Sequence, residues 1–337
     1  MLAPMKDQDL RSMITPPPSG MRGPMMHIAQ LDWILRGIQP GKLVVLGGYV
    51  GSYKTLLGIN MMYKNAINLK YNVMFLSLEM YEKEIYQRLI VRHANSPIFE
   101  KYSKSVTMHA LRNGELKTDE MEFLCDIVIP DLQTSKDYGN IMVVDNMAFD
   151  GNILGLADYV EKTWVSTYGQ GQTLDLLIID YIQLLAQYWG DGSDPTNATK
   201  KVASYLKRMA MGFNDHGMVV VALSQLSRAA YMAAKDVVKF SRERDPYQYL
   251  YSVTSFAESA EIERASDVAL TLFVDDTLKN EHAAFLQLIK NRDGESIEKG
   301  IKIRTSPDLA YIGDYVEDTG FSIDDYIGEL LGNVARL

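Results

Sequence analysis

Residues 48–55 have the composition and spacing of a loop that binds phosphate groups. The segment follows an apolar run that ends in glycines and precedes a helix-like stretch, which is the context that such a loop requires. Backbone N–H groups would wrap the phosphates of ATP, Lys54 would reach the terminal oxygens, and Thr55 would ligate Mg²⁺. The predicted nucleotide contacts are Gly48, Gly51, Ser52, Tyr53, Lys54 and Thr55.

One residue departs from the pattern of such loops. Tyr53 stands where the last glycine of G-x-x-x-x-G-K-T belongs. Its side chain would crowd the loop, and a backbone with positive φ would strain any residue that carries a Cβ. On this segment alone, the alternative is a glycine-rich turn between a strand and a helix, with an incidental Lys-Thr pair.

Three further polar residues end apolar runs elsewhere in the chain: Glu79, Asp180 and Gln225. Catalytic groups of open parallel sheets gather at the carboxyl ends of strands, so we expect all three to meet Lys54 at one edge. There Asp180 would hold Mg²⁺ through water, Glu79 would polarise the water that attacks the γ-phosphate, and Gln225 would sense that phosphate. Taken alone, Asp180 could instead be an acid that caps the next helix.

The surrounding pattern predicts an α/β fold with a mainly parallel, doubly wound sheet. Short apolar runs without alternation indicate strands buried on both faces. We expect them at 42–48, 72–80, 140–144, 174–179, 218–223, 268–273 and 284–289, with helices at 54–69 and 81–95. Three stretches without apolar periodicity, 187–198, 229–252 and 275–281, are predicted loops.

Composition leaves the partner open but excludes some classes. The chain has 337 residues and a net charge of −9, yet a strand-encircling protein needs only a local basic lining. No run reaches the roughly 18 apolar residues of a membrane helix, and the first residues lack an export signal. The single cysteine, Cys125, cannot form an internal disulfide, and we expect it to be buried in a reducing compartment.

Five phrases occur together in the order and spacing of one family. SLEM, IIDYIQLL, ALSQLSR, SAEIERASD and KNRDG resemble the motor domain of DnaB-type replicative helicases, over residues 28–314. This resemblance implies a RecA-like P-loop NTPase core. It assigns Lys54 and Thr55 to the Walker A motif, Asp180 to Walker B, Glu79 to the catalytic base and Gln225 to a nucleotide-state switch.

The resemblance also implies a ring. Lys290 and Arg292 look like the family's finger residues, which reach into the ATP site of a neighbouring subunit, and the implied assembly is a hexamer. Without the resemblance, these two cations could belong to a solvated turn. A cation supplied in trans would stabilise the charge that develops on the transferred phosphoryl group.

Single-stranded DNA is the implied partner, held by its backbone in the central pore. The gripping loop departs from the family, because Ala257 replaces its arginine, although Glu258 is retained. A solvated charged face is an equal alternative for each of the nearby groups. The candidates are Lys239, Arg242 and Arg244 near this loop and Lys200, Lys201, Lys207 and Arg208 on a second basic segment, with Tyr247, Tyr249 and Tyr251 as stacking surfaces.

The predicted organisation is an arm at 1–24 with a short docking helix, the motor at 25–318 and a helical tail at 319–337. The family's amino-terminal collar domain would be missing, as in a stripped-down viral form. The resemblance suggests a primase or a loader as partner, no membrane, and the cytoplasm of a bacterial or phage-infected cell. Two alternatives stay open: a recombination or branch-migration ATPase, and a non-hydrolysing DNA-binding ring disabled by Tyr53.

Overall fold

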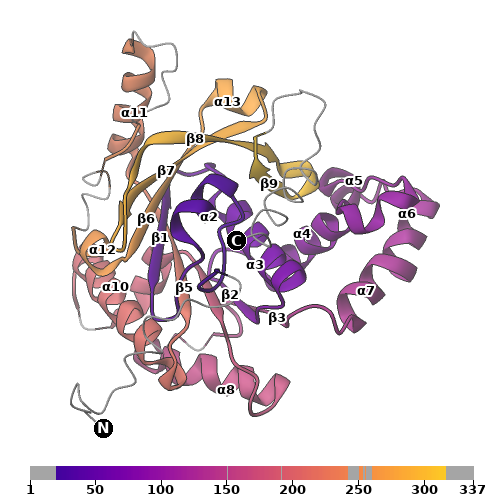
Figure 1. Ribbon diagram of the computed structural model, residues 1–337, viewed down its shortest axis with the longest axis horizontal. Helices are drawn as coiled ribbons and strands as arrows, with labels where there is room; N and C mark the ends of the chain where they lie inside the picture. The colour runs from indigo at the N-terminus through magenta and orange to yellow at the C-terminus, as the bar shows by residue number, and fades with distance from the viewer. Residues whose placement is uncertain are drawn as a thin grey trace.

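The computed structural model describes residues 20–149, 151–190, 192–241, 250–252, 255 and 260–315 (Figure 1). One nine-stranded sheet forms its centre, in the order β3-β2-β4-β5-β1-β6-β7-β8-β9. The strands are β1 Leu43–Gly48, β2 Val73–Ser77, β3 Ile141–Asp145, β4 Leu176–Asp180, β5 Val219–Gln225, β6 Val268–Phe273, β7 Ala283–Asn291, β8 Ile297–Ser306 and β9 Tyr311–Asp314.

The sheet is mainly parallel, as predicted. Each neighbouring pair in the run β3-β2-β4-β5-β1-β6 is parallel. The pairs β6–β7, β7–β8 and β8–β9 are antiparallel. Strands β8 and β9 lie outside the predicted strands, because neither is a continuous apolar run. In β8, buried Ile301 and Ile303 alternate with the more exposed Lys302 and Arg304, so only one face of this strand packs on the core.

Helices cover both faces of the sheet. Helix α3 contacts β1, β2, β4 and β5, whereas α9, α10 and α12 contact β1 or β5 from the other side (Figure 1). Helices α5, α6 and α7 form a lobe at the β3 side, and α11 projects away from the sheet. The helices are α2 Ala29–Leu35, α3 Lys54–Leu69, α4 Glu82–Ala94, α5 Met108–Asn113, α6 Thr118–Phe123, α7 Ile129–Thr134, α8 Leu156–Tyr168, α9 Ile182–Ala186, α10 Pro195–Gly212, α11 Arg228–Phe240, α12 Ala260–Ala265 and α13 Asp276–Asn280.

Two of the predicted loops contain helices instead. Helix α11 begins after Ser227, whose side chain accepts a hydrogen bond from the N–H of Ala230, and α13 begins after Asp275, which caps Leu278 in the same way. In α11 Ala234 is the one buried residue, so this helix packs little of its surface against the core. The third stretch ends inside α10, which begins at Pro195.

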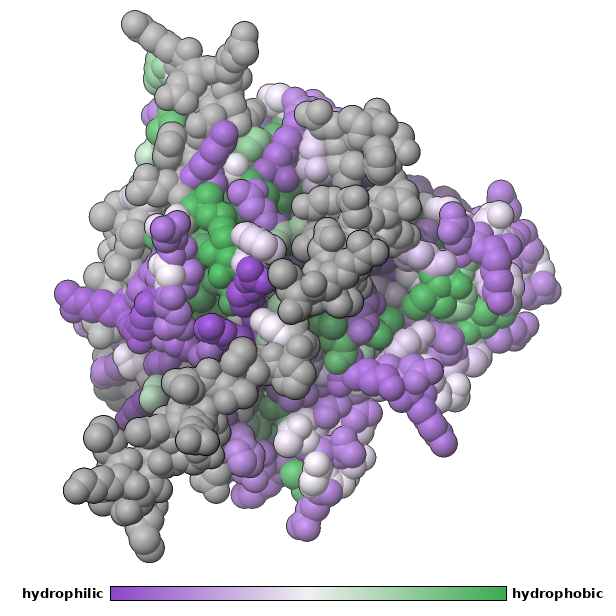
Figure 2. All heavy atoms as spheres, in the orientation of Figure 1, coloured by the Kyte–Doolittle hydropathy of each residue, from purple (hydrophilic) through white to green (hydrophobic). Residues whose placement is uncertain are grey.

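The expectation that Cys125 is buried is wrong. Its side chain is exposed, because it lies in a π-helical turn at Leu124–Val128 that directs Leu124 and Val128 to the core instead. The remaining core follows the predicted strands, and β1, β2, β4 and β6 are buried along their whole length. Hydrophilic residues dominate the described surface seen in Figure 2, with apolar residues in smaller patches.

Among the residues described, no helix is long and apolar enough to cross a lipid bilayer. The predicted arm and tail fall largely outside the described residues, so those boundaries stay predictions.

The segment that leads into α2 is clasped to the body of the domain by Asn65 on α3. The Asn65 side chain accepts a hydrogen bond from the N–H of Met25 at 2.8 Å and donates one to its carbonyl at 2.8 Å. Close by, Asp32 accepts from the N–H of Met26 at 2.8 Å, and Asp314 on β9 accepts from the N–H of Ala29 at 2.9 Å. These contacts fix where the chain enters the sheet.

We expect Asn65→Ala to lower the free energy of unfolding by about 2 kcal/mol, because two backbone groups of Met25 lose their partner. Urea unfolding measures this change, and limited proteolysis should show faster cleavage before residue 28. Asn280→Ala, which removes an exposed amide at the end of α13, is the matched control. Equal stability of the two variants would show that the hydrogen bonds between Asn65 and Met25 do not stabilise the fold.

Candidate active site

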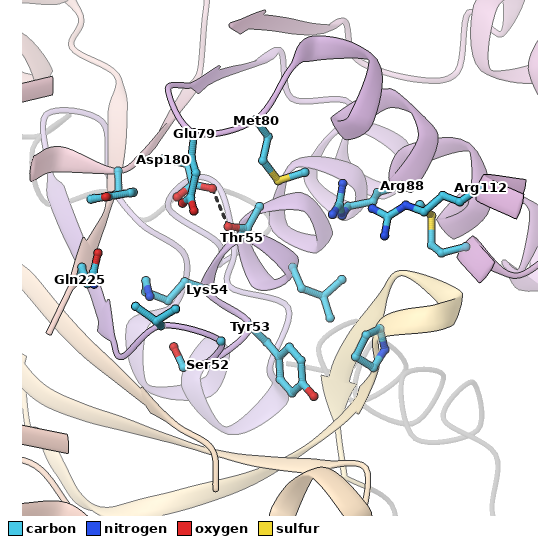
Figure 3. Close-up of a pocket in the computed structure, with 16 residues that line it drawn as sticks. Ser52, Tyr53, Lys54, Thr55, Glu79, Met80, Arg88, Arg112, Asp180 and Gln225 are labelled. Atoms are coloured by element: carbon cyan, nitrogen blue, oxygen red, sulfur yellow. Dashed lines mark hydrogen bonds between the residues drawn. The ribbon is translucent and has the colours of Figure 1, made fainter. Parts of the chain in front are cut away.

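Four neighbouring parallel strands bring the predicted catalytic residues to one edge. In the sheet order β2-β4-β5-β1, Glu79 follows β2, Asp180 ends β4 and Gln225 ends β5, while the loop with Lys54 follows β1. Neighbouring strands end level in two pairs: Ser77 of β2 pairs with Asp180 of β4, and Gly48 of β1 pairs with Gln225 of β5. All four side chains line one cavity of about 310 Å³ (Figure 3). The expected convergence is confirmed.

The loop at residues 48–55 has the backbone shape of a phosphate cradle. A Cβ on Gly48 would lie 2.3 Å from the Ser52 hydroxyl and 3.0 Å from the Leu272 carbonyl, so only glycine fits there. Gly51 has φ +74°, which favours glycine. The buried Ser52 hydroxyl has no hydrogen-bond partner within the described part of the chain. A phosphate oxygen in the cradle would satisfy this hydroxyl and the loop N–H groups.

Tyr53 adopts the left-handed conformation that the missing glycine would have supplied, with φ 66° and ψ 23°. Such a conformation strains a residue with a Cβ by about 1–2 kcal/mol. The strain does not break the loop, because α3 still begins at Lys54 and the N–H of Leu57 donates to the Tyr53 carbonyl at 3.0 Å. In Figure 3 the Tyr53 ring points away from Lys54, Asp180 and Glu79.

Lys54, Asp180 and Glu79 form a charged group on one side of the cavity. The Lys54 ammonium donates to the carbonyls of Gly48 at 2.8 Å and Tyr49 at 3.0 Å, a folded-back position over the loop. Burial lowers the pKa of Lys54 to about 8, although the charges of Asp180 and Glu79 raise it. A γ-phosphate would bring further negative charge and favour the ammonium form.

Thr55 and Asp180 are already joined. The Thr55 hydroxyl donates to a carboxylate oxygen of Asp180 at 2.6 Å (Figure 3). Burial raises the pKa of Asp180 to about 6, the hydrogen bond from Thr55 lowers it, and the charge of Glu79 raises it. Within the described residues no cluster of three or more His, Cys, Asp or Glu forms a preformed metal cage. One hydroxyl and one carboxylate suit Mg²⁺, which keeps several waters and shares phosphate ligands.

Glu79 lies just beyond β2, exposed at the mouth of the cavity. A tight turn presents it: the Ser77 hydroxyl donates to the Met80 carbonyl at 2.7 Å, and the N–H of Leu78 donates to the Asp180 carbonyl at 2.8 Å. An exposed carboxylate beside the phosphate cradle can accept a proton from water. The turn therefore orients the Glu79 carboxylate without burying it.

Sequence reasoning missed the residue that holds Gln225 in place. The Gln183 amide donates to the Gln225 carbonyl at 3.0 Å and to the Ser224 hydroxyl at 3.0 Å, and its oxygen accepts from the N–H of Gln225 at 3.1 Å. This brace fixes the end of β5 against α9. The position of Gln183 in IIDYIQLL is compatible with such a role, but no local pattern indicates it.

Two arginines from outside the predicted motifs also line the cavity. Arg88 comes from α4 and Arg112 from α5 (Figure 3). Burial lowers the pKa of Arg88, and the positive charge of Arg112 lowers it further, while Glu84 and Asp180 raise it. The proximity of two cations can be relieved by a bound polyanion. The linear sequence gave no signal for them, because the lobe that carries Arg112 folds back onto the sheet edge.

The predicted finger residues lie elsewhere and are held by hydrogen bonds. Arg292 donates to the buried carboxylate of Asp267 at 3.0 Å and to the Arg264 carbonyl at 2.9 Å. Lys290 donates to the Ser266 carbonyl at 2.8 Å. Arg292 is half-exposed, with 46% of its side chain accessible. Both cations thus sit on a rigid support at the end of β7.

Arg292 and Lys290 lie at the opposite end of the strands from the phosphate loop, as the contacts of Asp267 show. Its carboxylate accepts from the N–H of Leu43, the first residue of β1, at 2.8 Å. The phosphate loop follows Gly48 at the other end of β1, about 16 Å away at the usual rise per strand residue. Arg292 therefore lies outside the cavity of its own chain.

The predicted DNA contacts are only partly described. Arg242, Arg244, Glu258, Tyr247 and Tyr249 lie outside the described residues. Tyr251 is buried at 6% exposure, so its prediction as a stacking surface is wrong. The Lys207 ammonium forms an ion pair with the Asp267 carboxylate at 2.7 Å, and only 18% of its side chain is exposed. Lys200 and Lys201 lie on α10, where Lys201 donates to the Ser193 hydroxyl at 2.7 Å.

We expect Asp180→Asn to stabilise the nucleotide-free protein. The pKa of Asp180 rises from 3.8 to about 6 on folding, so its ionised form destabilises the folded state above about pH 6. The gain should be about 2–3 kcal/mol near pH 7.5 and should fade as the pH falls toward 4. Urea unfolding at several pH values measures it. A variant that is less stable than wild type at pH 7.5 would contradict this account.

Comparisons with known proteins show the family of this chain. The sequence profile of the DnaB-like helicase C-terminal domain matches residues 23–307. A replicative DNA helicase DnaB of Mycoplasma genitalium is 26% identical over 298 residues, covering 85% of this chain and 55% of the relative. A probable replicative DNA helicase of Guillardia theta is 29% identical over 202 residues, covering 59% of this chain and 29% of the relative. The chain thus spans about half or less of these relatives.

Solved structures share the fold. The ATPase domain of G40P superposes with a TM-score of 0.70 at 19% identity, covering 91% of this chain and 96% of that domain. A DnaB-like replicative helicase, solved in a study of its interactions with primase, gives 0.68 at 19% identity, covering 91% of this chain and 65% of the other. The architecture is therefore the RecA-like α/β fold. The profile match over most of the chain shows that the protein belongs to the DnaB-like helicase family, through its C-terminal domain.

Proposed function

We propose that this chain is the ATP-driven motor of a ring-forming DNA helicase, which translocates on single-stranded DNA. The observation that carries the proposal is the set of four strand ends around one cavity, with an ammonium, two carboxylates and an amide from neighbouring parallel strands. Membership of the DnaB-like helicase family supports the same activity. Single-stranded DNA, further copies of this chain in a hexamer, and a primase or loader are the proposed partners.

In the proposed site the chain's own groups divide the work. The cradle N–H groups, the Ser52 hydroxyl and Lys54 bind the phosphates of ATP, and Thr55 with Asp180 holds Mg²⁺. The metal supplies charge neutralisation at the phosphate oxygens. Glu79 accepts the proton of the attacking water. Gln225, which Gln183 holds in place at the end of β5, responds to whether the γ-phosphate is present.

We propose that Arg292 and Lys290 serve a neighbouring subunit. The support is their distance from the cavity of their own chain, the 46% exposure of the Arg292 side chain, and the hydrogen bonds that hold both cations at the other sheet edge. A ring that places this edge beside the next cavity would make hydrolysis depend on subunit contact. The alternative of a non-hydrolysing ring requires Tyr53 to obstruct the loop at 48–55. The Tyr53 ring instead points away from Lys54, Asp180 and Glu79 (Figure 3), which favours a hydrolysing site.

The first test is ATP hydrolysis with and without single-stranded DNA, read alongside native mass. We expect turnover that DNA stimulates, in assemblies larger than a monomer. Lys54→Ala should abolish turnover through lost phosphate binding, and Glu79→Gln should retain bound ATP while turnover falls at least about 100-fold. Turnover that survives both changes would remove the site assignment.

The trans role can be tested by mixing two inactive variants. We expect Arg292→Ala to bind nucleotide but to lose about 10³-fold in turnover, the size typical of an arginine finger. In rings mixed from Arg292→Ala and Glu79→Gln subunits, some interfaces combine an intact Glu79 with an intact Arg292 from the next subunit. Activity should therefore return on mixing. Mixed rings that stay as inactive as their parents would refute a contribution in trans. Lys162→Ala, which removes an exposed cation on α8, is the control.

A further inference from the structure

The cavity has two chemically different ends. Lys54, Asp180, Glu79 and Gln225 gather at one side, and the Tyr53 ring points away from them (Figure 3). Apolar side chains besides Tyr53 also line the cavity, among them Leu56, Met108 and Pro307. Two cations, Arg88 and Arg112, lie on the side away from Lys54 and Gln225 (Figure 3). Phosphates and Mg²⁺ account for the charged end and leave the apolar side chains without a role.

The apolar residues come from three elements that are fastened together. Pro307 opens the short helical turn η8, Pro307–Leu309, between β8 and β9. On one side, the Asn60 amide of α3 donates to the Ala310 carbonyl just after this turn at 2.9 Å. On the other side, the Asp308 carboxylate accepts from the N–H of His109 at 2.8 Å.

Leu56 lies one helical turn before Asn60 on α3, and Met108 directly precedes His109 on α5. The two hydrogen bonds therefore hold Leu56, Met108 and Pro307 around the same part of the cavity. Leu56 and Met108 are themselves largely buried, at 8% and 4% exposure, so each presents a fixed apolar surface. Such a wall is suited to a flat, weakly polar group.

Tyr53 adds an aromatic ring to this wall. Its left-handed backbone, at φ 66°, is one that glycine adopts without strain and a tyrosine does not. The ring is half-buried against the core and still lines the cavity. A strained residue persists where its surroundings fix it, and such positions cluster at ligand sites.

We propose that Tyr53, Leu56, Met108 and Pro307 form the subsite for the base of the bound nucleotide, with the Tyr53 ring as its stacking surface. The proposal rests on the proposed nucleotide site at residues 48–55. With its triphosphate in the cradle and its γ-phosphate toward Glu79, a nucleotide extends its base away from the charged end. A purine ring then meets an aromatic face and three apolar side chains, an arrangement that favours stacking.

On this proposal, the tyrosine at the glycine position is a functional substitution and not a defect. The loop backbone retains the shape that the phosphates need, because Tyr53 takes up the positive φ. The side chain that glycine lacks supplies contact with the base. Tyr53 therefore raises the affinity for a nucleotide over that for its phosphate chain alone.

The test compares ATP with inorganic tripolyphosphate, each with Mg²⁺, by calorimetry on the full chain. The measured quantity is the ratio of the two affinities, because tripolyphosphate reports on the cradle and ATP on the cradle plus the base. Loss of one base–aromatic stack corresponds to roughly 5- to 150-fold in affinity. We expect Tyr53→Leu to lower the ratio about 10-fold, with tripolyphosphate binding unchanged, and Tyr53→Phe to retain the wild-type ratio.

Tyr53→Gly separates the ring from the backbone strain. We expect it to bind tripolyphosphate at least as tightly as wild type, because the strain is gone, and to show the same lowered ratio as Tyr53→Leu. Tyr81→Leu, which removes an exposed tyrosine that does not line the cavity, is the matched control and should keep the ratio. Thermal melts establish that each variant is folded.

The outcomes distinguish this inference from the proposed function. A ratio unchanged in both Tyr53→Leu and Tyr53→Gly, with tripolyphosphate still bound, would overturn the base subsite and leave the phosphate site standing. A wild-type protein that binds neither ligand would overturn the proposed nucleotide site itself. Tighter ATP binding by Tyr53→Gly with no fall in the ratio would show that the tyrosine only strains the loop.

Discussion

The parallel register of β2, β4, β5 and β1 is the constraint on which the rest of this structure depends. Ser77 is level with Asp180 and Gly48 is level with Gln225, while Ile179 pairs with Ala222, so all four strands end within about two residues of one another. A slip of one strand by one residue would move its polar side chain by about 3.3 Å and turn it to the other face of the sheet. Full burial of β2 and β4 opposes such a slip, since both faces are already packed.

The same sheet separates the phosphate loop at 48–55 from the support that holds Arg292. Asp267 joins the first residue of β1 to Lys207 and Arg292, so one buried carboxylate ties together a central strand, α10 and the end of β7. A carboxylate at 2% exposure is tolerated because it accepts a backbone hydrogen bond and faces two cations. Strand β1 thus connects the phosphate loop at one end to this support at the other, which gives a rigid route between them.

The charged end of the cavity carries unfavourable electrostatics in the absence of a ligand. Burial lowers the pKa of Lys54 and raises that of Asp180, so each group is held in an environment that disfavours its ionised form. A bound metal and phosphates would supply the missing opposite charges. Stability and binding are therefore opposed in this part of the molecule, as expected where a site is prepared for a charged ligand.

The sequence by itself determined the parallel strands and the residues at their ends, because fully buried strands read as unbroken apolar runs and the loop at 48–55 has a local pattern. It did not reveal the one-sided strand β8, the helix α11 or the exposure of Cys125, since these depend on what packs against each element. Only the tertiary structure brought Gln183, Arg88 and Pro307 to the site. Their contacts join elements far apart in the chain, and local sequence carries no record of which distant segments will meet.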